Sequence, residues 1–165
     1  MPAEAVRFSR EELPELLFFD TSFILAVVFV HEVHHEPSVE FLARLKSAAA
    51  LVVVSPVLRL EYFNGWRRAM VEGVVGRSRG ADESERRRLF GMAQGVLDDM
   101  LAHFRVREVR LTESVQDRTV ELMKKHNLQS LDAVNVAAAL EIGCRDIVSL
   151  DDDFRRVEGV RLWMP

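Results

Sequence analysis

The stretch from Leu16 to Leu25, which reads LLFFDTSFIL, limits the folds available to this chain more than any other. Four consecutive apolar residues lead directly into Asp20, and the chain becomes apolar again after two hydroxyl residues. An apolar run that contains two phenylalanines is typical of a strand buried on both faces, as in a parallel sheet. A carboxylate at the end of such a strand is costly to bury unless it is paired. We therefore expect Asp20 to face a compensating partner.

Strands and helices are predicted to alternate along the rest of the chain. The predicted strands are 16–20, 51–54, 106–109, 147–150 and 160–163, and the predicted helices are 21–30, 37–47, 55–70, 82–103, 112–126 and 130–143. This alternation predicts an α/β fold with a central, mostly parallel sheet of about five strands flanked by helices. The length of 165 residues suits one domain, which we place at residues 16–165 after an N-terminal extension of residues 1–15.

The composition is that of an intracellular protein without a membrane segment. The one cysteine, Cys144, excludes an internal disulfide and fits a reducing compartment. Residues 1–15 are polar and acidic rather than basic and then apolar, so no signal peptide is expected. The apolar run around residue 20 is interrupted by Asp20, which argues against a transmembrane span. We therefore expect a cytoplasmic location.

The net charge of −4 does not suggest a nucleic-acid-binding protein, but arginines are concentrated in the middle of the chain. The candidates for phosphate contact are Arg67, Arg68, Arg77 and Arg79. Such a cluster can form a phosphate-binding surface. The alternative is a solvated pair of helices in which arginines pair with acids such as Glu83 and Glu85.

Acidic residues are predicted to gather at one edge of the sheet. Asp20 and Asp151 end two predicted strands, and Asp153 follows two residues later. Ligands of parallel α/β proteins bind at this carboxyl edge. Asp132 lies in the first turn of a helix and Glu61 lies within one, among apolar neighbours. Each acid alone has a structural explanation, such as a helix cap for Asp20.

Together, such carboxylates repel each other, and their pKa values rise unless a cation is present. Oxygen ligands in this number suit Mg²⁺ or Mn²⁺. A cation held there can polarise a phosphodiester and activate a water molecule. The acids therefore indicate a metal site with hydrolytic chemistry.

The same residues resemble the PIN domain, and most closely the VapC-like ribonuclease toxins of toxin–antitoxin modules. The resemblance is carried by Phe19-Asp20-Thr21-Ser22, by Ser55-Pro56 with Glu61 following, by Leu131-Asp132-Ala133 with the apolar run 137–143, and by 148–154. These motifs occur in the family's order and span nearly all of residues 16–155. The resemblance implies a three-layer fold and a metal-dependent endoribonuclease that cuts RNA by attack of water on phosphorus.

The resemblance also implies the site residues and the partners. Carried over by motif, the catalytic acids are Asp20, Glu61, Asp132 and Asp151. Of these, Asp20, Asp132 and Asp151 would bind Mg²⁺ or Mn²⁺, and Glu61 would position or activate water. The additional pocket residues are Ser22, Ser149 and Asp153. The implied partners are an RNA substrate, a cognate antitoxin and a second copy of the chain in a homodimer.

Two positions depart from the family pattern. The aromatic residue often found before the third acid is Leu131, and the histidine often found three residues after that acid is Asn135. Neither supplies a carboxylate, so we expect altered substrate contacts rather than lost metal binding.

Three alternatives stay open on the sequence. Residues 31–35, HEVHH, match the zinc-protease pattern H-E-x-x-H, but Pro37 follows at once and the motif needs a stable helix. A receiver-type phosphoacceptor domain also places acids at strand ends, but it requires a lysine late in the chain after a strand, where this chain has acids. A catalytically silent PIN-like module that binds RNA or protein would share all the sequence features above.

Overall fold

One parallel sheet forms the centre of the molecule. The computed structural model describes residues 2–72 and 83–165. Their strands are β1 (Glu4–Arg7), β2 (Leu16–Phe19), β3 (Leu51–Val54), β4 (Arg105–Glu108), β5 (Asp146–Val148) and β6 (Arg161–Met164). They are ordered β1-β6-β5-β2-β3-β4, and every neighbouring pair is parallel. The prediction of an α/β fold is confirmed, and β1 adds a sixth strand to the five expected.

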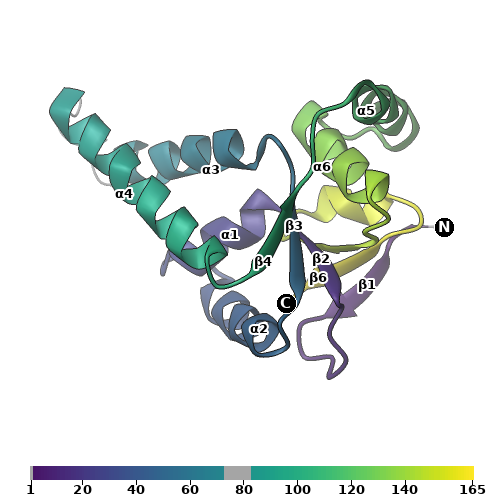
Figure 1. Cartoon of the computed structure of the whole chain (residues 1–165), viewed down its shortest axis with the longest axis horizontal. Helices are drawn as coiled ribbons and strands as arrows, with labels where there is room; N and C mark the ends of the chain where they lie inside the picture. Colours follow the sequence, from purple (N-terminus) through teal and green to yellow (C-terminus); the bar gives the residue numbers. More distant parts are fainter. Residues whose placement is uncertain (1, 73–82) are drawn as a thin grey trace.

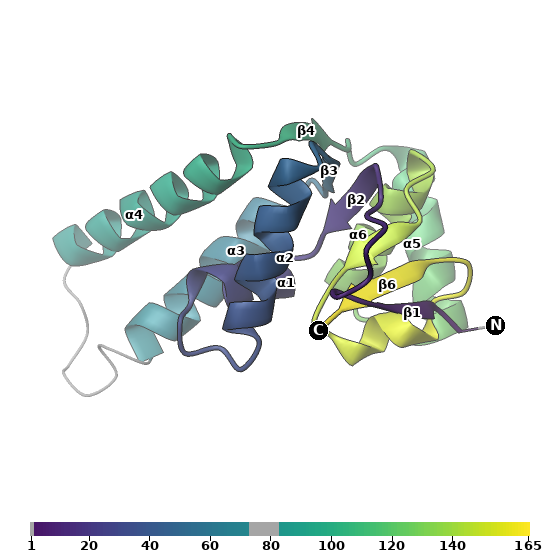
Figure 2. The ribbon, with the colours of Figure 1, turned by 90° about the horizontal axis from the view of Figure 1, so that it is seen from below.

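Helices cover both faces of this sheet (Figures 1 and 2). They are α1 (Thr21–Val28), α2 (His35–Ser47), α3 (Leu58–Arg67), the π-helical η1 (Arg68–Glu72), α4 (Glu83–Leu101), α5 (Glu113–His126), α6 (Ser130–Glu141) and the 3₁₀ helix η2 (Asp152–Arg156). Helices α1 to α4 pack on one face, and α5 and α6 pack on the other. Within the described residues, no helix has the length and the apolar character needed to span a membrane.

Strand β2 shows why the sequence there is apolar without interruption. Successive side chains of a strand point to opposite faces of the sheet. Leu17 and Phe19 accordingly belong to the core beneath α1 to α4, whereas Phe18 belongs to the core beneath α5 and α6. All three are fully buried. Both cores therefore depend on this one central strand, which also delivers Asp20 to the carboxyl edge.

One helix begins where it was predicted, and another begins later. Helix α1 begins at Thr21, and Asp20 caps it, because its side chain accepts from the backbone N–H of Ser22. Helix α3 begins at Leu58 instead of Ser55, because Ser55 closes a turn: its Oγ accepts from the N–H of Val57 at 3.3 Å. Glu61 consequently lies in the first turn of α3 and not deeper in a longer helix.

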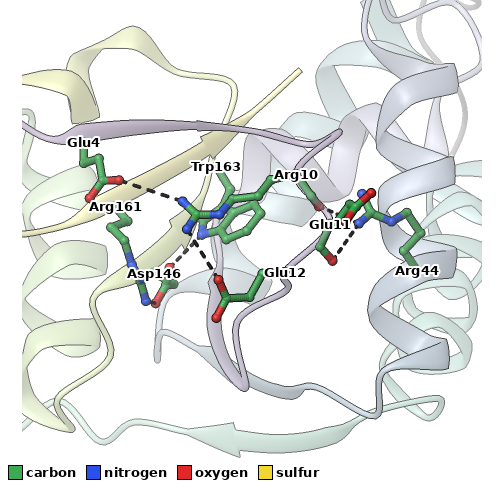
Figure 3. Close-up of polar contacts among 8 residues, drawn as sticks. All are labelled: Glu4, Arg10, Glu11, Glu12, Arg44, Asp146, Arg161 and Trp163. Carbon is green, nitrogen blue, oxygen red and sulfur yellow. Dashed lines mark hydrogen bonds and ion pairs between the residues drawn. The ribbon is translucent and has the colours of Figure 1, made fainter.

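The segment before β2 forms the outermost strand of the sheet and then returns to the opposite, amino edge, where β2 begins. Strand β1 pairs with β6, and the loop that follows is held by Arg44 of α2. The Arg44 guanidinium donates to the carbonyl oxygens of Arg10 and Glu11 (Figure 3), and also to that of Phe8. One side chain thus satisfies three carbonyls of an irregular segment that would otherwise need other donors.

A buried acid completes this edge. Asp146, at the start of β5, accepts from Trp163 Nε1 at 2.7 Å and from Arg161 Nη2 at 2.5 Å (Figure 3). Trp163 is buried, and Arg161 is partly exposed. The carboxylate therefore ties the first residue of β5 to two residues of β6.

Replacing Asp146 by alanine is expected to destabilise the fold by about 1–3 kcal/mol, because it leaves the buried indole N–H of Trp163 without an acceptor. The free energy of unfolding is measured by urea titration. Asp152→Ala, which breaks an exposed pair with Arg155, is the matched control and should change it by less than about 1 kcal/mol. Equal effects of the two substitutions would contradict this account of Asp146.

Candidate active site

The four predicted acids line one hollow at the carboxyl edge of the sheet. The hollow has a volume of about 500 Å³ and includes Asp20, Glu61, Asp132 and Asp151. The other lining residues are Thr21, Ser22, Leu25, Leu60, Asn64, Gly65, Arg68 and Leu131. Strand β2 lies between β5 and β3, so the segments that leave these strands meet here. The structure thus brings together acids from four separate parts of the chain.

Asp20 lies deepest, with only 5% of its surface exposed. Its Oδ2 accepts from Ser22 Oγ at 2.5 Å, from Ser149 Oγ at 2.9 Å and from the Ser22 backbone N–H at 3.2 Å. Its Oδ1 accepts from Asn135 Nδ2 at 3.1 Å. Burial raises the pKa of Asp20, and the hydrogen bonds from the two serines oppose that rise. The compensating partners expected for this acid are therefore neutral donors.

The serines join the turns that carry two of the acids. Ser22 Oγ lies 3.1 Å from Ser149 Oγ and accepts from the N–H of Leu150 at 2.9 Å. Ser149 Oγ in turn accepts from the N–H of Asp151 at 3.0 Å. The predicted pocket role of both residues has this geometric basis: Ser22 lines the hollow, and the fully buried Ser149 holds Asp20 from beneath.

Glu61 is linked to Asp20 through an amide. Its Oε2 accepts from Asn135 Nδ2 at 3.0 Å and from Thr21 Oγ1 at 3.1 Å. Burial raises the pKa of Glu61, and the nearby charge of Asp20 adds to the rise. Two carboxylates thus share one neutral donor group at the back of the hollow.

The pKa of Asp132 is raised by its acidic neighbours as well as by burial. Asp132 lies in the first turn of α6, as predicted. Burial, together with the charges of Asp20, Asp151, Glu61 and Asp153, raises its pKa to about 7. A cation in the hollow would relieve this repulsion.

Two of the predicted residues lie apart from this hollow. Asp153 forms an ion pair with Arg156 at 2.7 Å and gives its backbone N–H to Asp151, the cap of η2. Arg67 donates to Asn64 Oδ1 on its own helix, whereas Arg68 lines the hollow. The two remaining arginines, Arg77 and Arg79, lie outside the described residues.

The H-E-x-x-H motif has no helix to support it. Residues 29–34 form the connection between α1 and α2. The first histidine of the motif, His31, lies in this connection. The second, His35, begins α2, and its Nδ1 lies 2.8 Å from the carbonyl oxygen of Ala26. The zinc-protease alternative therefore lacks the helical context that its chemistry needs.

The chemistry of the hollow fits a hard divalent cation. Among the described residues, its lining offers carboxylate and hydroxyl oxygens but no histidine or cysteine, and oxygen donors are what Mg²⁺ and Mn²⁺ prefer. In the described part of the chain, however, no three His, Cys, Asp or Glu side chains already form a group that could hold a metal ion. The acids share a hollow and affect one another's charge without forming a closed ligand set.

Asn135 is the site residue whose part sequence reasoning missed. We expected this position to affect substrate contacts, but its amide bridges two of the acids. A signal was present in the sequence: residues three apart lie on the same face of a helix, and Asn135 follows Asp132 at that spacing in an apolar segment. A polar side chain in that place indicates a partner near Asp132.

The sequence matches the PIN domain family over residues 17–160. No curated protein matches it significantly. Among solved structures, the chain is similar to Mycobacterium tuberculosis VapC20, a sarcin–ricin loop cleaving toxin, with 20% identity and a TM-score of 0.56 over 84% of this chain and 92% of that one. It is also similar to Rickettsia felis VapBC2 bound to a promoter DNA fragment, with 15% identity and a TM-score of 0.58 over 89% of this chain and 96% of that one. A toxin–antitoxin complex from Klebsiella pneumoniae is similar as well, with 16% identity and a TM-score of 0.52 over 87% of this chain and 94% of that one.

The raised pKa values predict how the stability of the metal-free protein depends on pH. Asp132 ionises near pH 4 in the unfolded chain but near 7 in the fold, so the folded state holds the proton longer. The free energy of unfolding, measured by urea titration in EDTA, should therefore fall as the pH rises from 5 to 7.

Asp132→Asn removes the titrating group and should flatten this dependence. Millimolar Mn²⁺ should restore stability at pH 7 in the unmodified protein, because it binds the ionised carboxylates. A metal-free protein whose stability rises over this range would contradict the mutual repulsion inferred for the hollow.

Proposed function

The chain belongs to the PIN domain family, and on that basis we propose that it is a metal-dependent endoribonuclease whose active site is the acidic hollow. One observation carries the proposal: four acids from separate segments line the same hollow, where burial and the charges of the neighbouring acids raise the pKa of Asp132 to about 7. Structural acids are usually paired with cations, whereas these face one another. Family membership also sets aside the receiver-type phosphoacceptor.

We assign Asp20, Asp132 and Asp151 as the residues that would hold Mg²⁺ or Mn²⁺. When bound, such an ion polarises a phosphodiester and favours ionisation of the attacking water. The Oδ2 atom of Asp20 is held by Ser22 and Ser149, while Oδ1 accepts one hydrogen bond from the described residues and so keeps a lone pair. Asp20 is thereby fixed in orientation and still able to bind.

Glu61 is assigned to water. Its Oε2 is occupied by Thr21 and Asn135, and its Oε1 accepts no hydrogen bond from the described residues. Burial shifts the pKa of Glu61 toward neutral pH, and a general base works best when its pKa lies near the working pH. Glu61 would take a proton from the attacking water while its other oxygen stays anchored.

Arg68 is the basic residue of the described lining. At the mouth of an acidic hollow it offers a guanidinium to the phosphate of an approaching RNA strand. Arg67, Arg77 and Arg79 are proposed as further phosphate contacts outside the hollow.

A biological role is proposed from the similar structures, which include a toxin and a toxin–antitoxin complex. We infer that this chain acts in the cytoplasm as the toxin of such a pair, inhibited by a cognate antitoxin and assembled as a homodimer. The second candidate is a PIN-like module that binds RNA or protein without cutting it, and cleavage assays separate the two.

Asp20→Asn is expected to lower Mn²⁺-dependent cleavage of RNA at least about 100-fold, because it removes a proposed ligand from the hollow. Cleavage of labelled RNA is measured on gels, with circular dichroism to check the fold. Asp152→Asn, an exposed neighbour outside the hollow, serves as the control and should cleave normally. Absence of metal-dependent cleavage by the unmodified protein on any RNA would favour the binding module.

Arg68→Ala should weaken RNA binding and lower the slope of log K against log salt by about 1, as expected for one lost phosphate contact. Binding is measured by fluorescence anisotropy in the Asp20→Asn background, so that the RNA stays intact. Arg59→Ala is the comparison, because Arg59 is an exposed arginine of α3 that pairs with Asp98 and its loss removes an equal charge. Equal changes from both substitutions would indicate a general charge effect instead of a contact at the hollow.

A further inference from the structure

Asn135 occupies an unusual position between two acids. The residue is 1% exposed and lies on α6, on the opposite face of the sheet from α3, which carries Glu61. Its Nδ2 lies 3.1 Å from Asp20 Oδ1 and 3.0 Å from Glu61 Oε2. An amide nitrogen has two hydrogens, so each carboxylate can receive one of them.

The other end of the same amide is left without a partner. Asn135 Oδ1 is buried and makes no hydrogen bond in the described structure. Leaving such a buried acceptor unpaired is unfavourable. The reverse orientation would place the carbonyl oxygen against two carboxylates, which is worse. The orientation of Asn135 is therefore set by its two donations and not by packing of its own oxygen.

The donor at this position is neutral, and that matters for a cation site. Lys or Arg would also bring two carboxylates together, but its charge would satisfy them and oppose the entry of a divalent ion. In residues 2–72 and 83–165 neither Asp20 nor Glu61 forms an ion pair with a basic side chain. An amide reduces the repulsion between them while leaving the negative charge in place.

We propose that Asn135 is a positioning residue, which holds Asp20 and Glu61 side by side so that the hollow is pre-organised for a divalent cation. This inference rests on the proposed function, because it assigns to the acids a metal that they would hold. It extends that function by adding Asn135, a residue of the motif around Asp132 that would not bind the metal itself. The sequence led us to expect that Asn135 affects contacts with the substrate. We propose instead that it orients the two acids.

The test is the affinity for Mn²⁺, measured by isothermal titration calorimetry without RNA. Asn135→Leu keeps a side chain of similar size but removes the donors, and it should bind Mn²⁺ about 10- to 100-fold more weakly, as for other residues that orient metal ligands. Thr119→Val is the matched control, since it also removes a buried hydrogen-bonding group, but Thr119 lies on α5 outside the hollow and donates to the carbonyl oxygen of Val115. Its Mn²⁺ affinity should match that of the unmodified protein.

A second variant covers the case in which Asn135→Leu does not fold. Asn135→Asp keeps the shape but places a third carboxylate against the other two. Its melting temperature in EDTA should fall, and saturating Mn²⁺ should raise it by more than in the unmodified protein.

The outcomes separate this inference from the function on which it rests. Unchanged Mn²⁺ affinity in Asn135→Leu, or an unchanged Mn²⁺-induced shift in Asn135→Asp, would overturn the role of Asn135 alone, with cleavage by the unmodified protein intact. Absence of Mn²⁺ and Mg²⁺ binding by the unmodified protein would overturn both.

Discussion

The burial of the Asp20 carboxylate is the interaction on which the rest of the site depends. The acid follows the central strand β2 and is almost completely enclosed, yet its partners are two serine hydroxyls, a backbone N–H and an amide. These donors come from three separate parts of the chain, so satisfying one carboxylate draws the β2–α1 turn, the end of β5 and helix α6 together. A charged partner would have been simpler, but it would have removed the negative charge that makes the hollow acidic.

The two-sided packing of β2 holds Asp20 in place. Phe18 is fixed in the core beneath α5 and α6, and Leu17 and Phe19 are fixed in the core beneath α1 to α4. Movement of Asp20 would therefore disturb side chains in both layers. Its neighbours Glu61 and Asp132 come from helices on opposite faces of the sheet, α3 and α6. The sheet edge serves as the common frame for groups that the two helical layers supply.

Much of the fold followed from local patterns, and the failures have physical causes. The continuous apolar runs at 16–19 and 51–54 predicted buried strands, and the motif order predicted the PIN domain family. Strand β1 could not be predicted, because its pairing with β6 depends on residues more than 150 positions away. The start of α3 was missed because the Ser55 side chain closes a turn instead of capping a helix. The spacing of Asn135 from Asp132 indicated a place near the site, but its role depends on contacts with Asp20 and Glu61, which are distant in sequence.

The strand order has a consequence for how the molecule comes into being during translation. Asp20 and Glu61 emerge from the ribosome early, but Asn135, Ser149 and Asp151 belong to the last third of the sequence, and β2 reaches its place beside β5 only after residue 148 has been made. Contacts of such long range close late and slowly. A nascent chain thus carries half of its acids with their partners still unmade, and the complete acidic hollow exists only once synthesis has passed residue 151.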